Sequence, residues 1–283
     1  MSGPQVSRGG VCHQLPIVPL LGVGVTNATK EDAVTLMDAW IRARDGRARA
    51  VFFVNAHTLN LACENSTYRN VLNSADIVFG DGTGVRLAAR LRHVRLRDNV
   101  NGTDLLPAFF RARLGHGYRY FLLGGAPGTA ERAAKRLESD FPGIRIAGHH
   151  HGYITDRDTP DVLGMLDTAA PDMLLVGMGN PKQEEWIHRH LPRLRVPVSI
   201  GVGGLFDHWS GVLQRAPQWV RDLGMEWAQL LMQQPHKWRR YFLGNPKFVL
   251  RAISDALQAS PVGRLDGGAR SVSPDGETRM EQR

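Results

Sequence analysis

The chain has 283 residues, of which 42% are hydrophobic and 22% are charged. This length and composition exclude a fibrous or wholly disordered protein and suffice for one large α/β domain with an appendage. The 35 Lys and Arg residues outnumber the 27 Asp and Glu residues, and the net charge of +8 favours a polyanionic partner such as nucleic acid, anionic lipid or a phosphorylated substrate. The two cysteines, Cys12 and Cys63, cannot form a disulfide framework and indicate a reducing, cytosolic compartment.

The N-terminal region begins with residues 1–14, which we expect to be disordered. Residues 9–29 contain no Asp, Glu, Lys or Arg, so they must be tested as a signal peptide or a membrane span. Pro16 and Pro19 interrupt this stretch and glycines dilute it, so the sequence supports neither. Residues 15–25 are predicted to enter the fold as an extended segment.

A series of strands and helices fills residues 15–212, the predicted α/β domain. Thr29 and Asp32 have the spacing of a helix cap, which predicts a helix over residues 29–44. Strands that alternate with helical stretches indicate a Rossmann-like, mainly parallel sheet with helices on both faces. Ligands of such sheets bind at the carboxyl ends of the strands. Apolar, β-rich runs predict strands at residues 49–55, 76–80, 118–124, 144–148, 172–177 and 196–201.

Residues 213–257 differ in composition from the domain before them. They are predicted to be helical, and they carry seven Lys and Arg residues against three Asp and Glu residues, together with Trp219, Trp227 and Trp238. Aromatic rings and cations on one helical segment suit an anionic membrane surface; the alternative is that the tryptophans pack on the core and the charges face water. Residues 258–283 have no apolar period and are predicted to be a disordered tail.

Four glycine-rich loops follow predicted strands, at residues 80–84, 124–128, 177–181 and 201–204. Glycine lets backbone amides approach a ligand, and a following helix N-terminus favours an anion, so the set suits a phosphate or diphosphate. The alternative for any single loop is a tight strand-to-helix turn without a ligand. None of the loops has the GxGxxG spacing of dinucleotide-binding oxidoreductases, and the sequence has no Walker-type phosphate-binding loop.

Asp81 lies between two glycines directly after the predicted strand at residues 76–80. Its carboxylate is expected to project toward a ligand at the carboxyl ends of the strands. Partial desolvation there raises the pKa of a carboxyl group and suits a general base. The alternative is a helix N-cap, a position that Asp favours, because residues 82–90 could start a helix.

The loop at residues 177–181 leads into a predicted helix, which places Lys182 and Gln183 beside any bound phosphate. Three consecutive histidines at residues 149–151 cannot converge on one ion from an extended strand, and we interpret them as a surface turn. Residues 156–158 read Asp-Arg-Asp but lie in a polar stretch before a predicted helix, which favours a solvated loop. Neither a metal nor a cofactor is therefore predicted.

Taken together, these segments resemble the WecG/TagA/CpsF family of glycosyltransferases over roughly residues 15–241. The resemblance implies an inverting, metal-independent enzyme that moves a sugar from a UDP-sugar to an undecaprenyl-diphosphate-linked saccharide, in the synthesis of cell-surface polysaccharide or exopolysaccharide. It implies a cytoplasmic protein attached peripherally to the inner face of the membrane. The matching motifs are ADIVFGDG at 75–82, VNGTD at 100–104, FLLGG at 121–125, residues 148–153, GMGNPKQE at 177–184, GVGG at 201–204, residues 206–207, 215–217 and 226–227, and Pro235.

The resemblance also implies roles for individual residues. Asp81 corresponds to the catalytic base. Residues 213–257 complete the active site, where Arg240 reaches the diphosphate. The other substrate-binding positions are loop glycines and polar side chains, namely Asn55, Gly82, Asn99, Gly124, Gly125, Gly179, Lys182, Gln183, Gly203, Arg215 and Lys237.

Some positions depart from the pattern of better-studied members. Phe53 stands where some members have a threonine, and Asn99 stands where an arginine usually precedes the Val-x-Gly-x-Asp run. Leu230 and Lys237 stand where arginines are expected. Other cations such as Arg97 lie near enough in the sequence to replace them, but the family's donor preference does not transfer to this chain.

The expected mechanism is a single displacement, in which Asp81 deprotonates the acceptor hydroxyl while loop amides and cations stabilise the leaving diphosphate. A non-catalytic protein that binds a nucleotide-sugar or lipid-phosphate is the main alternative. A nucleic-acid binder is disfavoured because the sequence contains no reading motif or base-stacking platform. The sequence leaves the sugar, the acceptor saccharide, the pathway and the oligomeric state open, a homo-oligomer included.

Overall fold

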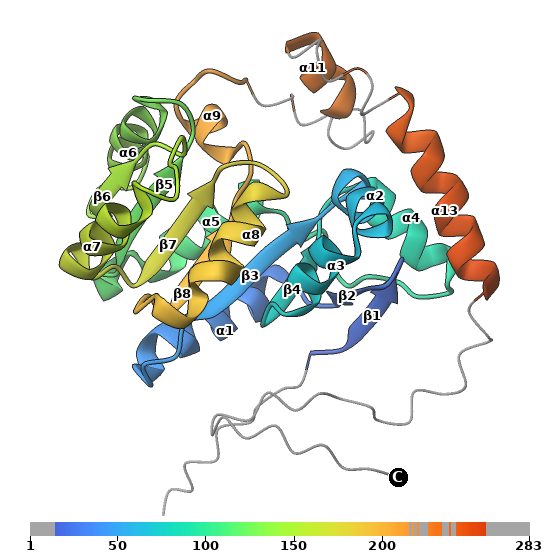
Figure 1. Ribbon diagram of the computed structural model, residues 1–283, viewed down its shortest axis with the longest axis horizontal. Coiled ribbons are helices and arrows are strands. Elements are labelled where there is room, and N and C mark those ends of the chain that lie inside the picture. Colours follow the sequence, from blue (N-terminus) through green and yellow to red (C-terminus); the bar gives the residue numbers. More distant parts are fainter. Residues whose placement is uncertain are drawn as a thin grey trace, which may run out of the picture.

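The computed structural model describes residues 15–214, Pro217, Val220, residues 226–233, Trp238 and residues 242–258. This part of the chain contains an eight-stranded sheet between two layers of helices (Figure 1). The strands are β1 (Ile17–Leu20), β2 (Val23–Thr26), β3 (Arg49–Val54), β4 (Ile77–Gly80), β5 (Arg119–Gly124), β6 (Arg145–His150), β7 (Met173–Gly177) and β8 (Val198–Gly201). The helices are α1 (Lys30–Ala43), α2 (Ala56–Glu64), α3 (Ser66–Asn73), α4 (Thr83–Leu91), α5 (Gly102–Arg113), α6 (Thr129–Asp140), α7 (Thr159–Ala169), α8 (Lys182–His190), α9 (Leu205–Trp209), α11 (Glu226–Gln233) and α13 (Gly244–Gln258).

The sheet has the order β1-β2-β4-β3-β8-β7-β5-β6, and its strands are parallel except β1. The α/β class and the mainly parallel sheet are therefore confirmed. The predicted extended segment at residues 15–25 is a hairpin, in which β1 pairs antiparallel with β2. The parallel strands are covered by helices on both sides, which explains why they read as continuous apolar runs in the sequence.

The interpretation of residues 149–151 as a surface turn is wrong for the first two of them. His149 and His150 are the last residues of β6 and pair with Leu122 and Leu123 of β5. The β-ladder continues past Gly148 to His150 because Leu122 and Leu123 of β5 still offer backbone partners there. β6 is the edge strand of the sheet, and the side chain of His149 is exposed.

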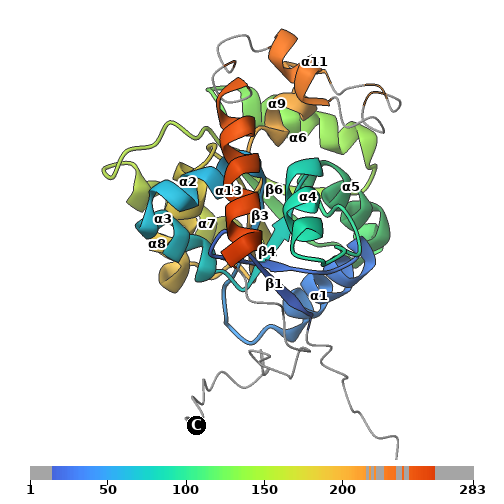
Figure 2. The same ribbon diagram turned by 90° about the vertical axis from the view of Figure 1, so that its right-hand side faces the viewer.

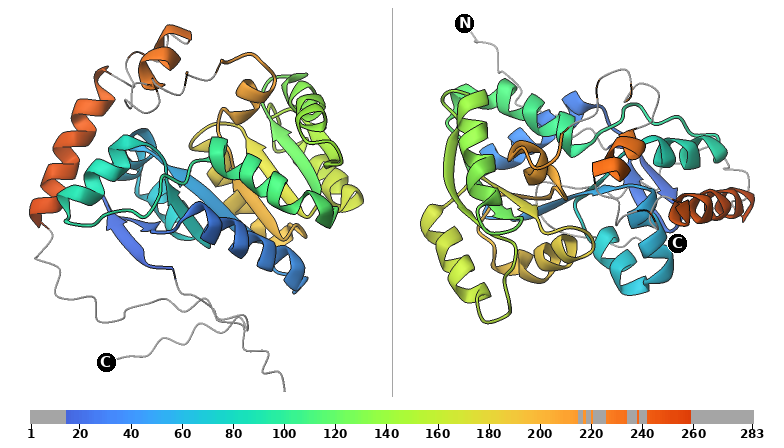
Figure 3. Two further views of the ribbon diagram at one scale, coloured as in Figure 1. Left: turned by 180° about the vertical axis from the view of Figure 1, so that it is seen from behind. Right: turned by 90° about the horizontal axis from the view of Figure 1, so that it is seen from above.

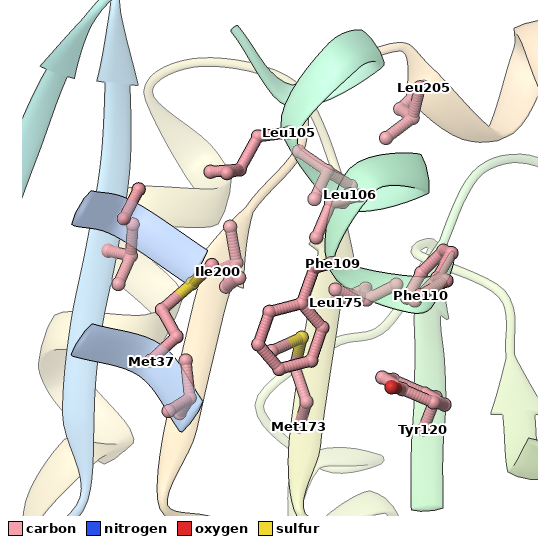
Figure 4. Packing of buried hydrophobic residues seen from close by; sticks show 14 of the residues in the cluster. Met37, Leu105, Leu106, Phe109, Phe110, Tyr120, Met173, Leu175, Ile200 and Leu205 are labelled. Carbon is pink, nitrogen blue, oxygen red and sulfur yellow. The ribbon is translucent and has the colours of Figure 1, made fainter. Parts of the chain in front are cut away.

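Two buried clusters hold the helices on the sheet, one on each face. On one face α1, α5, α6 and α9 pack against the sheet; Figure 4 shows this cluster, in which Met37, Phe109 and Phe110 meet Leu175 and Ile200. On the other face lie α2, α3, α7 and α8. The first helix begins as predicted, because the Thr29 hydroxyl accepts from the Asp32 N–H at 3.1 Å and the Asp32 carboxylate accepts from the Thr29 N–H at 2.9 Å.

The last described helix, α13, lies beside α2 and α4 at the β1 end of the sheet (Figures 1 and 2). Its Phe248 and Ala252 are buried, and Asp255 forms a 2.9 Å ion pair with Arg92, at the end of α4. The distal part of residues 213–257 therefore packs on the α/β domain. The predicted disordered ends lie outside the described residues, except that α13 includes Gln258. None of the helices described is both long and apolar enough to cross a bilayer.

Candidate functional site

The carboxyl ends of the parallel strands meet at one edge of the sheet, the upper side in Figure 1. β3 and β8 are neighbours, but the helices that follow them, α2 and α9, pack on opposite faces. Ligands of open α/β sheets bind at such a switch point. The loops after β4, β3, β8 and β7 border it, on the side seen in Figure 3 (right), and we take them as the candidate site.

Asp81 directly follows β4 at this edge. Its N–H donates to the Val54 carbonyl of β3 at 2.8 Å, which fixes the residue beside the end of the neighbouring strand. The N-cap of α4 is Gly82, which has no side chain that could cap the helix. Instead, Asn99 Oδ1 accepts from the Gly82 N–H at 2.8 Å. The N-cap position of α4 thus falls on Gly82 and not on Asp81, and the role of Asp81 as a general base stays a prediction.

Asn55 follows β3, one strand away from Asp81. Its Oδ1 accepts from the N–H groups of His57 at 3.0 Å and Thr58 at 3.2 Å, and so caps α2. The group that Asn55 can offer a ligand is therefore its Nδ2. The structure places this residue at the predicted site but adds a capping role, which the Asn-Ala-His-Thr spacing of a capping box could have revealed.

The two glycines at the end of β5 have a packing reason that needs no ligand. A Cβ on Gly124 would lie 2.3 Å from the carbonyl oxygen of Gly177 in β7. The N–H of Gly125 donates to that oxygen at 2.8 Å, and the N–H of Gly152 donates to the Gly125 carbonyl at 2.8 Å. The loops after β5, β6 and β7 therefore pack backbone against backbone, and a tight turn accounts for Gly124 and Gly125.

Three other predicted glycines face open space instead. Among the described residues, a Cβ on Gly82, Gly179 or Gly203 would meet no atom within 4 Å beyond its own chain neighbours. These glycines belong to the loops after β4, β7 and β8, which border the switch point, and the first two loops lead into α4 and α8. Space beside these α-carbons lets a ligand approach the backbone next to helix N-termini, which suits an anionic group such as a diphosphate.

Gln183, predicted to line the substrate pocket, is 2% exposed. Its Oε1 accepts from the Gly203 N–H at 2.9 Å, and its Nε2 donates to Glu184 Oε1 at 2.7 Å. Both ends of this amide are thus hydrogen-bonded within the protein. The structure brings Gln183 to the site, where it ties the start of α8 to the loop after β8.

The sequence analysis did not single out Glu184, which is fully buried. Its Oε1 also accepts from Asn180 Nδ2 at 2.6 Å, and its Oε2 accepts from the Tyr68 hydroxyl at 3.3 Å. Burial raises the pKa of Glu184 to about 7, although its hydrogen bonds favour the ionised form. Acidic residues are common in the first turn of a helix, so the sequence contained no signal for this role.

The remaining predicted residues are only partly placed. Lys182 is exposed at the start of α8, while Arg215, Lys237 and Arg240 lie outside the described residues. Two positions that depart from the family pattern have side chains that the structure describes. Asn99 accepts the hydrogen bond from the Gly82 N–H, and Phe53 is a core residue whose ring centroid lies 6.0 Å from that of Phe79. The solvated loop at residues 156–158 is confirmed, since the Asp156 side chain is 95% exposed.

A cavity of about 380 Å³ lies at the opposite edge of the sheet, away from the residues described above. Its lining includes Arg44 after α1, Asp172 before β7 and Pro197 before β8. It therefore opens at the amino ends of the strands, and none of the predicted site residues that the structure describes lines it. Since ligands of open α/β sheets bind at the carboxyl ends, this cavity is not the candidate site.

Comparisons with known proteins agree with the geometry. The model of the glycosyl transferase WecG/TagA/CpsF family matches residues 18–261. The chain is 34% identical over 202 residues to an N-acetylglucosaminyldiphosphoundecaprenol N-acetyl-beta-D-mannosaminyltransferase from Bacillus subtilis (strain 168), which covers 71% of this chain and 78% of the relative. Proteins of the same name from Bacillus spizizenii (strain ATCC 23059 / NRRL B-14472 / W23) and Staphylococcus aureus (strain MRSA252) are 35% identical over 192 residues (68% of this chain, 74% of the relative) and 32% identical over 210 residues (74% and 82%).

Proposed function

Because this chain belongs to the WecG/TagA/CpsF family of glycosyltransferases, we propose that it transfers a sugar from a UDP-sugar to a saccharide carried on undecaprenyl diphosphate. The names of the relatives describe transfer of N-acetylmannosamine to an N-acetylglucosaminyl-diphosphoundecaprenol. They support a lipid-linked diphosphate acceptor and a hexosyl or N-acetylhexosaminyl donor. The observation that carries the proposal is Asp81, held at the switch point beside the open glycine loops.

In the proposed reaction Asp81 removes the proton of the acceptor hydroxyl, whose oxygen bonds to the anomeric carbon. The bond from that carbon to the diphosphate breaks on the opposite face, and UDP leaves with the electron pair, which inverts the configuration. Asp81 follows β4, whereas Gly203 and Gly179 follow β8 and β7, two and three strands away. At about 4.8 Å per strand, this separation of about 10–14 Å leaves room for a sugar between the base and the diphosphate.

The proposed stabilisation of the leaving diphosphate uses groups of the chain itself and no metal. The loops at Gly179 and Gly203 leave room beside their α-carbons for a ligand, the N-terminus of α8 carries a partial positive charge, and Lys182 at that terminus is exposed. Arg215, Lys237 and Arg240, which lie outside the described residues, are proposed to add cations from residues 213–257.

We further propose that the enzyme works as a peripheral protein on an anionic membrane, through residues 213–257. On α13, Leu250, Ile253 and Leu257 are exposed and recur at helical spacing, opposite the buried Phe248 and Ala252. Apolar side chains on the outer face of such a helix suit the headgroup boundary of a bilayer. Other exposed apolar side chains of this segment are Met232, Trp238, Phe242 and Leu243.

The test is release of UDP from a panel of UDP-sugars, in the presence of EDTA and with a polyprenyl-diphosphate-saccharide as acceptor. Acceptor-dependent release from one donor is expected, and the product should have the inverted anomeric configuration. Nucleotide binding without release from any donor would favour the alternative of a non-catalytic binding protein. Activity that EDTA abolishes and a divalent cation restores would contradict the metal-free mechanism.

A further inference from the structure

A buried carboxylate, Glu184, joins the loops that border the switch point. Its Oε1 receives hydrogen bonds from Gln183 Nε2 at 2.7 Å and Asn180 Nδ2 at 2.6 Å, and its Oε2 receives one from the Tyr68 hydroxyl at 3.3 Å. Tyr68 and Glu184 are both 0% exposed. In such surroundings hydrogen bonds are strong and an unpaired polar group is costly, so the arrangement is tightly specified.

The carboxylate fixes the orientation of two side-chain amides. Glu184 Oε1 accepts a hydrogen bond from each amide, so Gln183 and Asn180 present their NH2 groups to it. Gln183 Oε1 therefore points away from Glu184 and accepts from the Gly203 N–H at 2.9 Å. A Cβ on Gly201 would lie 3.0 Å from Gln183 Nε2, so this glycine leaves room for the amide. Through Gln183, Glu184 sets the position of the loop after β8.

We propose that Glu184 is a positioning residue of the transferase, which acts through Gln183 and Asn180 to hold the loops after β7 and β8 in the conformation that binds the donor diphosphate. This inference rests on the proposed function, which assigns the diphosphate to those loops. Being fully enclosed, Glu184 acts through its neighbours. Tyr68 extends the network to α3, the helix that precedes β4 and Asp81, so the carboxylate connects both sides of the site.

The test compares Glu184→Gln with Glu184→Leu in the UDP-release assay. Glutamine keeps the shape: its Oε1 can accept from both amides and its Nε2 can donate to the Tyr68 oxygen, so kcat/KM should stay within about threefold of the wild type. Leucine leaves both amides without an acceptor and should lower kcat/KM by about 10- to 100-fold. Glu185→Leu, which changes the next residue of the same turn, is the matched control and should stay within about twofold.

A double variant tests whether Glu184 acts through Gln183. Gln183→Met removes both hydrogen bonds of that amide, so Gln183→Met/Glu184→Leu should be no slower than the slower single variant. Losses that multiply would overturn the inference, as would wild-type kcat/KM in a folded Glu184→Leu. Should Glu184→Leu fail to fold, Tyr68→Phe replaces it, because it removes only the hydrogen bond to Oε2; it should lower kcat/KM by about 3- to 10-fold, and no loss would overturn the inference.

A second readout needs no turnover. Hydrogen exchange of the Gly203 N–H should be slow in the wild type and in Glu184→Gln, and at least about tenfold faster in Glu184→Leu or its replacement. Equal exchange in all variants would overturn the inference, whatever the activity. A wild type that protects Gly203 but releases no UDP from any donor would contradict the proposed function instead, so the two failures are distinguishable.

Discussion

The pH dependence of folding stability should reveal the buried Glu184. Burial raises the pKa of this carboxyl group from its ordinary 4.5 to about 7, so the folded protein binds the proton more tightly than the unfolded chain does. The contribution of Glu184 to folding stability is therefore fully present below pH 4.5 and is lost as the pH rises through 7. A shift of this size corresponds to about 3 kcal/mol, of which roughly 2 to 3 kcal/mol are lost between pH 5 and pH 8.

Glu184→Gln isolates this contribution, because glutamine does not titrate and keeps the hydrogen bonds. We expect the free energy of unfolding of the variant, measured by urea denaturation, to rise relative to the wild type by roughly 2 to 3 kcal/mol between pH 5 and pH 8. The comparison cancels other titrating groups, including Asp76, whose pKa burial also raises. Glu185→Gln is the control and should track the wild type. A difference between Glu184→Gln and the wild type that does not change with pH would refute the reasoning.

Three further predictions follow from particular contacts. Gly124→Ala places a Cβ 2.3 Å from a backbone oxygen and should lower the free energy of unfolding, measured by urea denaturation, by at least about 3 kcal/mol. Gly164→Ala on α7, where a Cβ meets no described atom within 4 Å, should raise it by about 1 kcal/mol. Equal effects would contradict the packing account. Asn99→Ala frees the Gly82 N–H and should lower kcat/KM about tenfold with an unchanged melting temperature, and unchanged kinetics would exclude a role for this contact. Replacing the exposed apolar residues of α13, Leu250, Ile253 and Leu257, with serine should weaken binding to anionic vesicles at least about tenfold, measured by co-sedimentation. The control Met165→Ser, which changes an exposed apolar residue of α7, should bind as the wild type does. An unaffected triple variant would argue against α13 as the membrane contact.

Local patterns predicted most of the sheet because its strands are short apolar runs that end in glycine or polar turns. The helix at residues 29–44 was equally accessible, since Thr29 and Asp32 carry the capping signal in neighbouring positions. The hairpin of β1 and β2 was missed because direction within a sheet depends on which strands pair. The end of β6 was missed because His149 is held in the ladder by Leu122, far away in the chain.

The candidate site was predictable where a residue's place follows from its strand. Asp81 and Asn55 lie at the carboxyl ends of β4 and β3 as expected. The structure was needed to separate Gly124, which a backbone contact requires, from Gly179 and Gly203, which face open space. Glu184 could not be found from the sequence, because its partner Tyr68 is 116 positions away and a glutamate in a first helical turn is unremarkable by itself.

The most direct test of the proposed reaction compares Asp81→Asn with the wild type. Asparagine has nearly the same shape but cannot take up the proton, so kcat for UDP release should fall by about 10²- to 10⁴-fold. Binding of the UDP-sugar, measured by calorimetry, should stay within about threefold, because the donor diphosphate is assigned to the loops after β7 and β8. Turnover by Asp81→Asn at the wild-type rate would contradict the role of Asp81 as the base.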